Sequence, residues 1–189
     1  FLTNRSWNTN KQKDPRPKVN VGIRPAELRD YEWIVNLYQL NANNGHFTPI
    51  PADKIGQFFI NLIINHNIEV RIAVDSARPE LGRINKLIDS RMLIITLEDI
   101  PIGFQMLSVE KKDGIDQMEL YLLAIAKEFQ NMGFGRFLTE HVIDQYRGKY
   151  LLFARCYKKS IVAKNMLKKL GFSTKRILES GTEEMYFKS

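Results

Sequence analysis

The chain has 189 residues, 44% of them hydrophobic, which is enough for one well-buried core and too short for two typical domains. Its 28 Lys and Arg against 21 Asp and Glu give a net charge of +7, which suits phosphate-bearing ligands, RNA and acidic proteins alike. The single cysteine, Cys156, excludes a disulfide within the chain and fits a reducing compartment, so we predict a cytoplasmic protein.

No segment indicates a membrane protein or a metalloprotein. The apolar runs fall short of the roughly 18 to 20 residues that a membrane span requires. The three histidines, His46, His66 and His141, do not have the spacing of metal ligands. We therefore expect no membrane contact and no metal.

The chain opens with a polar segment. Residues 1–18 are rich in Lys and Arg and lack the apolar core of a secretion signal. We predict that they form a flexible leader and that residues 19–189 form one domain. Because the chain begins at Phe1 and not at methionine, it can be a processed product or a piece of a longer protein.

Two helical patterns follow. Residues 21–26 are typical of a short strand and lead into a helix over 27–40. A loop over 41–51, rich in Asn and Pro, separates it from a second helix, which we predict Asp53 to cap. The two apolar stripes are Leu28, Tyr31, Ile34, Leu37 and Tyr38 in the first helix, and Ile55, Phe58, Phe59, Leu62 and Ile63 in the second.

The middle of the chain predicts strands. Residues 68–75 alternate apolar and polar side chains, as in a half-buried strand, and another strand is expected over 91–97. The intervening residues 76–90 have apolar side chains at helical spacing, and we predict a short helix there within an inserted segment. Further strands are expected over 102–111, 118–126, 150–156, 173–178 and 183–188.

The most informative stretch is a strand, a glycine loop and a helix. An apolar run over 120–126 precedes the loop 130–136, which reads Gln-Asn-Met-Gly-Phe-Gly-Arg, and a helical pattern continues to Tyr146. Unpaired N–H groups and the positive end of the helix dipole make such a first turn an anion site. The loop lacks the lysine of a P-loop and the third glycine of a dinucleotide fingerprint, so it belongs to neither class.

The next helix is also defined by local signals. A short strand over 150–156 is followed by a helical pattern over 160–170, with Ser160 as a good N-cap and Gly171 as a good C-terminal stop. Its apolar stripe consists of Ala163, Met166, Leu167 and Leu170.

In this order, these segments resemble the GNAT superfamily of N-acetyltransferases. The family's acyl-CoA loop usually reads Arg/Gln-x-x-Gly-x-Gly/Ala, and its next helix typically ends in Leu-Gly-Phe, as residues 170–172 do here. The opening strand and helix and the turn over 99–104 are similar as well. The resemblance covers roughly residues 19–188. It implies an α/β (α+β) fold, with a mixed, mainly antiparallel sheet of six to seven strands flanked by about four helices.

The resemblance also implies a cofactor and a reaction: acetyl-CoA donates an acetyl group to a primary amine, which attacks it directly. In the family the central strand separates from its neighbour near the position of Ile125, and backbone groups there bind pantetheine, with one N–H facing the thioester carbonyl. The loop would bind the pyrophosphate mostly through its N–H groups, with added charge from Arg136. The implied cofactor residues are Leu123, Ala124, Ile125, Gln130, Asn131, Met132, Gly133, Phe134, Gly135, Arg136, Ser160 and Ala163.

The amine must lose a proton, because an alkyl ammonium has a pKa of roughly 10. Glu119, six residues before Ile125, stands where some GNAT enzymes carry a catalytic glutamate. Its apolar neighbours would raise its pKa by desolvation and make it a better base near neutral pH. The alternative is a solvated strand residue that balances nearby lysines.

The leaving thiolate often receives its proton from a tyrosine four residues before the Leu-Gly-Phe glycine, where this chain has Leu167. Since a thiol has an unperturbed pKa near 8.5, its departure does not strictly demand an acid. Tyr157 is the reserve candidate, with Cys156 or water as substitutes, and a plain surface tyrosine is the alternative. Ser160 replaces an asparagine of many members and can still bond to pantetheine.

Several partners stay open. The acceptor can be a small-molecule or protein amine. The family resemblance implies that residues 43–47 help to select it. The alternative is that they form a solvated connecting loop in which Phe47 only fills space in the core. An acetyltransferase that acts on charged tRNA and a non-catalytic acyl-CoA-binding module are the two alternatives. A homodimer is plausible, with its interface formed by the last strands or by the inserted segment. The inserted segment could instead cover the acceptor cleft, or it could be a surface elaboration without a role.

Overall fold

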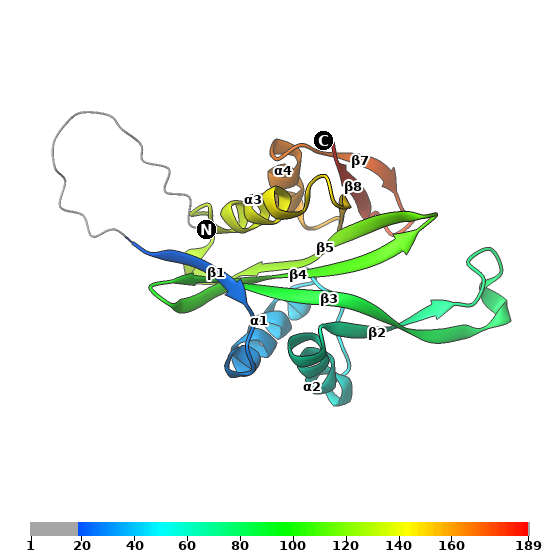
Figure 1. Cartoon of the computed structure of the whole chain (residues 1–189), viewed down its shortest axis with the longest axis horizontal. Helices are drawn as coiled ribbons and strands as arrows, with labels where there is room; N and C mark the ends of the chain where they lie inside the picture. The colour runs from blue at the N-terminus through cyan, green and yellow to red at the C-terminus, as the bar shows by residue number, and fades with distance from the viewer. Residues whose placement is uncertain (1–18, 189) are drawn as a thin grey trace.

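A computed structural model describes residues 19–188, and the predicted leader over 1–18 lies outside them. One sheet of eight strands crosses the described part of the chain, and four α-helices pack on it (Figure 1). The helices are α1 (Tyr31–Asn43), α2 (Ala52–Ile60), α3 (Phe134–Tyr146) and α4 (Ile161–Lys169). A single π-helical turn, Asn61–Asn65, extends α2.

The strands follow the order β1-β3-β4-β5-β6-β8-β7, and β2 pairs with β3 alongside this path. All pairs are antiparallel except β5 with β6. The bounds are β1 (Val21–Pro25), β2 (Asn67–Ala73), β3 (Arg83–Leu97), β4 (Ile100–Lys112), β5 (Ile115–Ile125), β6 (Leu151–Cys156), β7 (Phe172–Ile177) and β8 (Glu183–Phe187).

The predicted fold class, a mainly antiparallel mixed sheet with four helices, is confirmed. The strand number is eight and not six to seven, because β2 and the first half of β3 form an additional hairpin. The helix expected within residues 76–90 is wrong: only one 3-10 turn, Pro79–Leu81, precedes β3. Ile84 and Ile88 fit a helical stripe, but they also share one face of a strand, and pairing with β2 decides between the two.

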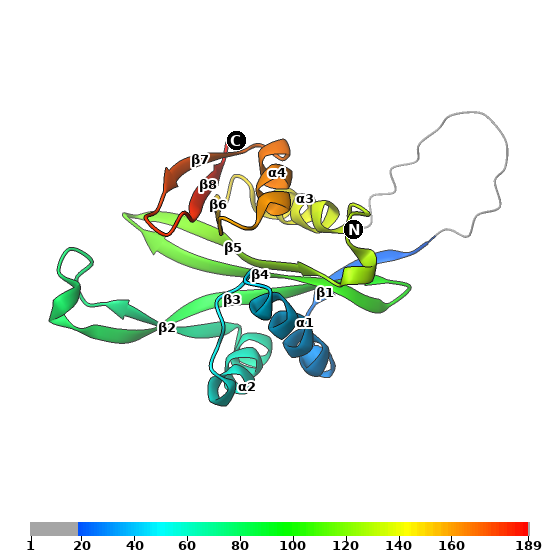
Figure 2. The ribbon, with the colours of Figure 1, turned by 180° about the vertical axis from the view of Figure 1, so that it is seen from behind.

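Two helical layers cover opposite faces of the sheet (Figures 1 and 2). On one face, Ile34 and Tyr38 of α1 and Phe59 of α2 form a core with the inner strands. On the other face, Val142 of α3 and Leu167 of α4 pack on β4 to β8. Most residues of the predicted stripes therefore lie on the buried faces of their helices. Leu28 is an exception, because it is 56% exposed in a 3-10 turn that precedes α1. The predicted cap Asp53 is also wrong, since Pro51 is the N-cap residue of α2.

Strand β5 departs from regular pairing at its centre. Its register with β4 shifts between Leu120 and Leu122, which leaves Tyr121 as an extra residue in a bulge. On its other side, β5 pairs with β6 only over Gln117–Glu119. Because β5 continues to Ile125, the two strands separate beyond Glu119 and leave one edge of β5 open.

Candidate active site

The glycine loop presents free backbone donors at the start of α3. The first hydrogen bond of the helix runs from the Phe137 N–H to the Gly133 carbonyl oxygen, at 2.9 Å. Within residues 19–188, the N–H groups of Phe134, Gly135 and Arg136 have no acceptor. Residues 130–133 are exposed, so these donors lie at an accessible surface. The free N–H groups that the sequence predicts at this helix start are therefore present, and anion binding by the loop stays a prediction.

The two glycines serve different needs. Gly133 is the N-cap of α3 with a φ of 87°, in the left-handed region, and a Cβ there would meet open space. At Gly135 a Cβ would lie 3.6 Å from Ile125, 3.7 Å from Leu123 and 3.9 Å from Met166 of α4. Gly133 is therefore required by backbone conformation, whereas Gly135 marks the place where β5, α3 and α4 meet.

Two polar side chains of the loop are already engaged. The Gln130 Nε2 donates to the Ile125 carbonyl oxygen at 2.9 Å, which ties the loop to the end of β5. The Arg136 guanidinium pairs with Glu140 one turn along α3, at 2.8 Å. Its charge is therefore shared with Glu140 and not directed at the loop alone.

The open edge of β5 leads from the loop to the centre of the sheet. The Ala126 N–H donates to the Ile102 carbonyl oxygen, so the alternation of an antiparallel pair points the backbone groups of Leu123 and Ile125 away from β4. They face the gap beside β6. The resemblance implies a separation near Ile125, but it begins earlier, after Glu119, where the bulge bends β5.

Helix α4 follows the end of β6, and its Met166 comes within 3.9 Å of the Cβ position of Gly135. Ser160 is its N-cap residue, but its hydroxyl makes no cap hydrogen bond and has no partner among the described residues. Ala163, one turn further on, is half-buried. Of the predicted cofactor residues, the structure brings the end of β5 and the loop together through Gln130 and Gly135, and the roles of Ser160 and Ala163 stay predictions. Ala124 alone points elsewhere, since its side chain is buried under the α1 layer.

Glu119 lies at the point where β5 and β6 separate. It is 7% exposed, and its carboxylate lies 3.6 Å from the Arg155 guanidinium. Burial raises the pKa of Glu119 to about 7, although Arg155 opposes the shift. A carboxyl with this pKa can accept a proton near neutral pH.

Tyrosines surround this carboxyl. Tyr121, the extra residue of the bulge, is 39% exposed, and burial together with the Glu119 charge raises its pKa. Burial raises the pKa of Tyr38 to about 12, with further contributions from Tyr121 and Tyr157. The sequence reasoning missed Tyr121 and assigned Tyr38 only to a helix stripe, because neither the bulge nor the approach of α1 has a local signal.

Tyr157 is fixed by a loop from the other side of the cleft. Its hydroxyl is hydrogen-bonded to the Thr48 hydroxyl, and the Tyr38 hydroxyl donates to the Thr48 carbonyl oxygen. Phe47 is buried and stacks on Tyr38 with ring centroids 5.5 Å apart, as a core plug. The loop over 44–51 therefore closes against the end of β6 through Thr48.

The other two side chains at or near the acid position are buried, and Leu167, which replaces the usual tyrosine, has no proton to donate. Leu167 is 4% exposed and belongs to the core between α4 and the sheet. Cys156 lies in the same core, and burial raises the pKa of its thiol to about 11. Tyr157 is therefore the accessible one of these three side chains.

A charged and aromatic strip continues from Glu119 across β6 and β8. Arg155 lies 3.6 Å from both Glu119 and Glu184, and its guanidinium stands 5.5 Å from the centre of the Phe153 ring. Phe153 in turn stacks on Tyr186 at 5.4 Å. Sequence reasoning missed this strip, because its members come from two strands whose pairing joins residues about thirty positions apart.

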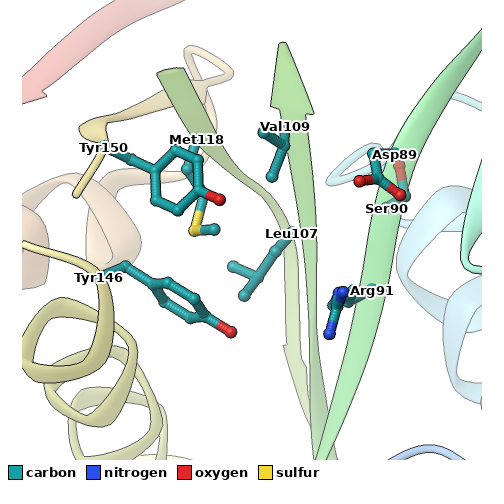
Figure 3. A pocket seen from close by; sticks show the side chains of 8 residues that line it. All are labelled: Asp89, Ser90, Arg91, Leu107, Val109, Met118, Tyr146 and Tyr150. Carbon is teal, nitrogen blue, oxygen red and sulfur yellow. The ribbon is translucent and has the colours of Figure 1, made fainter. Parts of the chain in front are cut away.

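A separate hollow of about 160 Å³ lies at the opposite end of α3 (Figure 3). Tyr146 and Tyr150 form one wall, and Leu107, Val109 and Met118 form its apolar floor. Tyr146 is the last residue of α3 and Gly133 precedes its first, so the helix, about 20 Å long, separates the hollow from the loop. The hollow is not part of the site around Glu119.

Within residues 19–188 no three His, Cys, Asp or Glu side chains are grouped in a way that could hold a metal ion. No described helix is both long and apolar enough to cross a membrane.

The model of the acetyltransferase (GNAT) family matches residues 66–172, which is more than half of the chain. The chain belongs to the GNAT family. The matched range contains the loop, Glu119, Tyr157 and the start of α4, and ends at Phe172. No curated protein sequence matches this GNAT chain.

Solved structures share the fold at low identity. An acetyltransferase from Thermus thermophilus is 16% identical with a TM-score of 0.60, over 88% of this chain and 94% of that one. Spermidine N-acetyltransferase from Vibrio cholerae, in complex with CoA and spermine, is 16% identical with a TM-score of 0.64, over 88% and 94%. Naa50 from Arabidopsis thaliana, bound to a CoA-peptide bisubstrate analogue, is 15% identical with a TM-score of 0.58, over 89% and 98%. At these identities the likeness shows the fold alone.

Proposed function

We propose that this GNAT protein is an N-acetyltransferase that moves an acetyl group from acetyl-CoA to a primary amine by direct attack. One observation carries the proposal: the gap between β5 and β6 runs from the free N–H groups of the loop to the buried carboxyl of Glu119. This gap would connect a binding site for the phosphates of coenzyme A with a carboxylate that can act as a base.

The residues along this path fit acetyl-CoA. The N–H groups of residues 131–136 would bind its pyrophosphate, and the backbone groups of Leu123 and the N–H of Ile125 would pair with the pantetheine amides, since Gln130 already occupies the Ile125 carbonyl oxygen. Ser160 and Ala163 would line the other side of the arm. Gly135 would let the arm pass close to α3, where its missing Cβ leaves contacts of 3.6 Å or more. When bound, acetyl-CoA supplies an acetyl group activated as a thioester.

The Leu123 N–H is our candidate for stabilising developing negative charge. It faces the gap, has no acceptor within residues 19–188, and is fixed by the pairing of β5 with β4. A preorganised donor of this kind favours the charge that grows on a carbonyl oxygen as an amine attacks.

Glu119 is our candidate base. An ammonium acceptor has a pKa of roughly 10, so it must lose a proton before it can attack. With a pKa of about 7, Glu119 is substantially ionised at neutral pH and can take that proton directly or through a water. Arg155, at 3.6 Å, would stabilise the ionised form and orient it.

Tyr157 is our candidate acid. Tyr157 directly follows the end of β6, and the hydrogen bond with Thr48 holds its hydroxyl in place. A phenol can give a proton to a departing thiolate and recover it from solvent. Cys156 is packed in the core and Leu167 has no proton to give, so neither is a better donor.

The acceptor would enter beside Tyr121 and the loop over 44–51, along the strip of Phe153, Arg155 and Glu184. This surface offers carboxylates and aromatic rings, which suit a cationic amine. The neighbours from Vibrio and Arabidopsis carry spermine and a peptide analogue respectively, and we propose that the acceptor is a small-molecule or protein amine. The lone buried cysteine supports a cytoplasmic location.

A second candidate function is a non-catalytic acyl-CoA-binding module. The observation that favours it is the burial of Leu167 at the position of the usual acid. This module would keep the loop and the open edge of β5, and it would bind coenzyme A without turnover.

Two measurements on the wild-type protein test the proposal. Calorimetry with coenzyme A should show binding, and a thiol-release assay with acetyl-CoA across polyamines, amino acids and peptides should show turnover with at least one class. Binding without turnover for any amine would favour the binding module. The absence of coenzyme A binding would overturn both functions.

A further inference from the structure

Strand β2 of the β2–β3 hairpin is an edge strand of the sheet. The hairpin projects beyond both helical layers at one end of the sheet (Figures 1 and 2). β2 pairs only with β3 among the described strands, so its other side presents unpaired backbone groups over Asn67–Ala73. Such an edge is a template for pairing with another strand.

The opposite edge of the sheet is protected. Edge strand β7 has a register shift between Thr174 and Arg176, and the extra residue is Lys175. A bulge and clustered positive charge are common devices against edge pairing. β2 has neither: its register with β3 is continuous, and it carries one acidic and one basic residue, Glu69 and Arg71.

The pairing of β2 with β3 decides which residues face outward. The Ser90 N–H donates to the His66 carbonyl oxygen, and the Val74 N–H donates to the Gly82 carbonyl oxygen. Because the hydrogen-bonding direction alternates along a strand, the even-numbered residues of β2 bond to β3. The odd-numbered residues turn their N–H and C=O groups to the open edge: Asn67, Glu69, Arg71 and Ala73.

We propose that a second copy of this chain pairs with this edge in antiparallel fashion, with a two-fold axis through Val70. Only the odd-numbered residues of β2 offer N–H and C=O groups to a partner, so in an antiparallel pair odd residues lie opposite odd residues. In a symmetric dimer this pairing places the two-fold axis on a residue of β2 and not between two residues. An axis through Glu69 or through Arg71 would place two like charges directly opposite each other. An axis through Val70 places Glu69 of each copy opposite Arg71 of the other and forms two ion pairs.

The two faces of β2 agree with this register. Neither Glu69 nor Arg71 has an ion-pair partner within residues 19–188, and both are exposed. On the other face, Ile68 and Ile72 would lie opposite each other across the axis, with Val70 facing its own copy. One face of the interface between the two β2 strands is thus charged and complementary, and the other face is apolar throughout.

Charge reversal tests the register. Wild-type protein should sediment as a dimer that dissociates on dilution. Glu69→Arg and Arg71→Glu should each raise the dissociation constant roughly ten- to thirtyfold, because each turns two attractive pairs into two repulsive ones. An equimolar mixture of the two variants should form heterodimers as readily as wild type, since every cross-strand pair is then opposite in charge. Recovery in the mixture also shows that both variants are folded.

Disulfide trapping gives a second measurement on the full chain. Residues on the axis lie about 4.5 Å apart between Cα atoms, within the range that a disulfide can bridge. Val70→Cys should therefore link two chains under mild oxidation. Ile84→Cys, exposed on β3 one strand inward, is the control and should stay unlinked. The native Cys156 is buried and should not react.

Three results would overturn the proposal: a wild-type protein that remains monomeric at every concentration, a dimer that neither charge reversal weakens, or a dimer in which Val70→Cys fails to link. The last two would assign the contact to another surface, such as β7. None of these measurements depends on acetyltransferase activity, so their failure would leave the proposed function untouched.

Discussion

The cofactor side and the acceptor side of β5 are built in different ways. The cofactor side consists of consecutive backbone groups: the open edge from Leu123 to Ile125, the loop, and the first turn of α3. The acceptor side consists of side chains from four separate segments, which contribute Tyr38, Thr48, Glu119 and Tyr157. A site made of backbone tolerates many side-chain changes, whereas one made of converging side chains depends on each of them. Single substitutions should therefore affect binding and turnover separately.

Replacing the base should have the largest effect and should fall on turnover alone. Glu119→Gln keeps the shape of the side chain but cannot accept the proton, so we expect turnover to fall about 10²- to 10⁴-fold. Coenzyme A affinity should remain within about twofold, because Glu119 lies beyond the loop and the open edge. Thiol release and calorimetry measure the two quantities. Glu32→Gln on α1, an exposed carboxylate that is not among the charges that shift the pKa of Glu119, is the control. Unchanged turnover in Glu119→Gln would remove this residue from the mechanism.

The raised pKa of Glu119 should make stability and activity change in opposite directions with pH. The folded-state pKa of about 7 lies above the ordinary glutamate value of 4.5, so the stability that this shift contributes is complete below about pH 4.5 and is lost as pH rises through 7. The loss is on the order of 3 kcal/mol by pH 8. Activity should rise over the same interval as the base ionises.

Denaturant unfolding of wild type and Glu119→Gln at several pH values checks this. The variant lacks the titration, so its stability relative to wild type should increase by on the order of 3 kcal/mol between pH 4.5 and 8. A difference that stays constant across this range would show that Glu119 titrates with an ordinary pKa in the folded protein, and an activity profile without an inflection near 7 would agree with that.

Changing the backbone of the loop should affect binding and not turnover. Gly133 has a φ of 87°, which costs an alanine roughly 1 to 2 kcal/mol, so Gly133→Ala should shift the loop and weaken coenzyme A binding about tenfold. Turnover at saturating acetyl-CoA should be nearly unchanged. Gly148 is the matched control, since its φ of 81° and open surroundings are the same but it lies at the far end of α3. Gly148→Ala should lose the same stability and keep the affinity. Equal affinity losses in both variants would mean that the loop does not bind the phosphates.

The same contrast explains what could be predicted from the sequence. The loop, the stripes of α1 to α3 and the end of α4 were predicted, because each depends on residues within one or two turns of each other. The sequence left Glu119 as either a desolvated base or a solvated strand residue, and its burial in the sheet agrees with the first. The bulge at Tyr121 and the hydrogen bond between Thr48 and Tyr157, 109 positions apart, have no local signal, because register and loop closure depend on the assembled sheet.

The β2–β3 hairpin shows where local reasoning fails. The spacing of Ile84 and Ile88 satisfies a helical stripe and a strand face equally well. The choice between them depends on β2, which supplies seven paired residues across the turn. A hairpin with continuous pairing buries more backbone hydrogen bonds than an isolated short helix, which is marginal in water.

Replacing the candidate acid Tyr157 should have the smallest effect on turnover. It separates the roles of two residues on the acceptor side, Tyr157 and Thr48. A thiol with a pKa near 8.5 can leave as a thiolate, so Tyr157→Phe should lower turnover about tenfold or less. Thr48→Val should have a smaller effect in the same direction, because Thr48 acts only through Tyr157. If so, the turnover of the double variant should equal that of Tyr157→Phe, since the effects of two substitutions in one hydrogen bond are not additive. Tyr150→Phe, in the separate hollow, is the control. Additive losses in the double variant would show that Thr48 contacts the acceptor directly, and unchanged turnover in Tyr157→Phe would assign the proton to water.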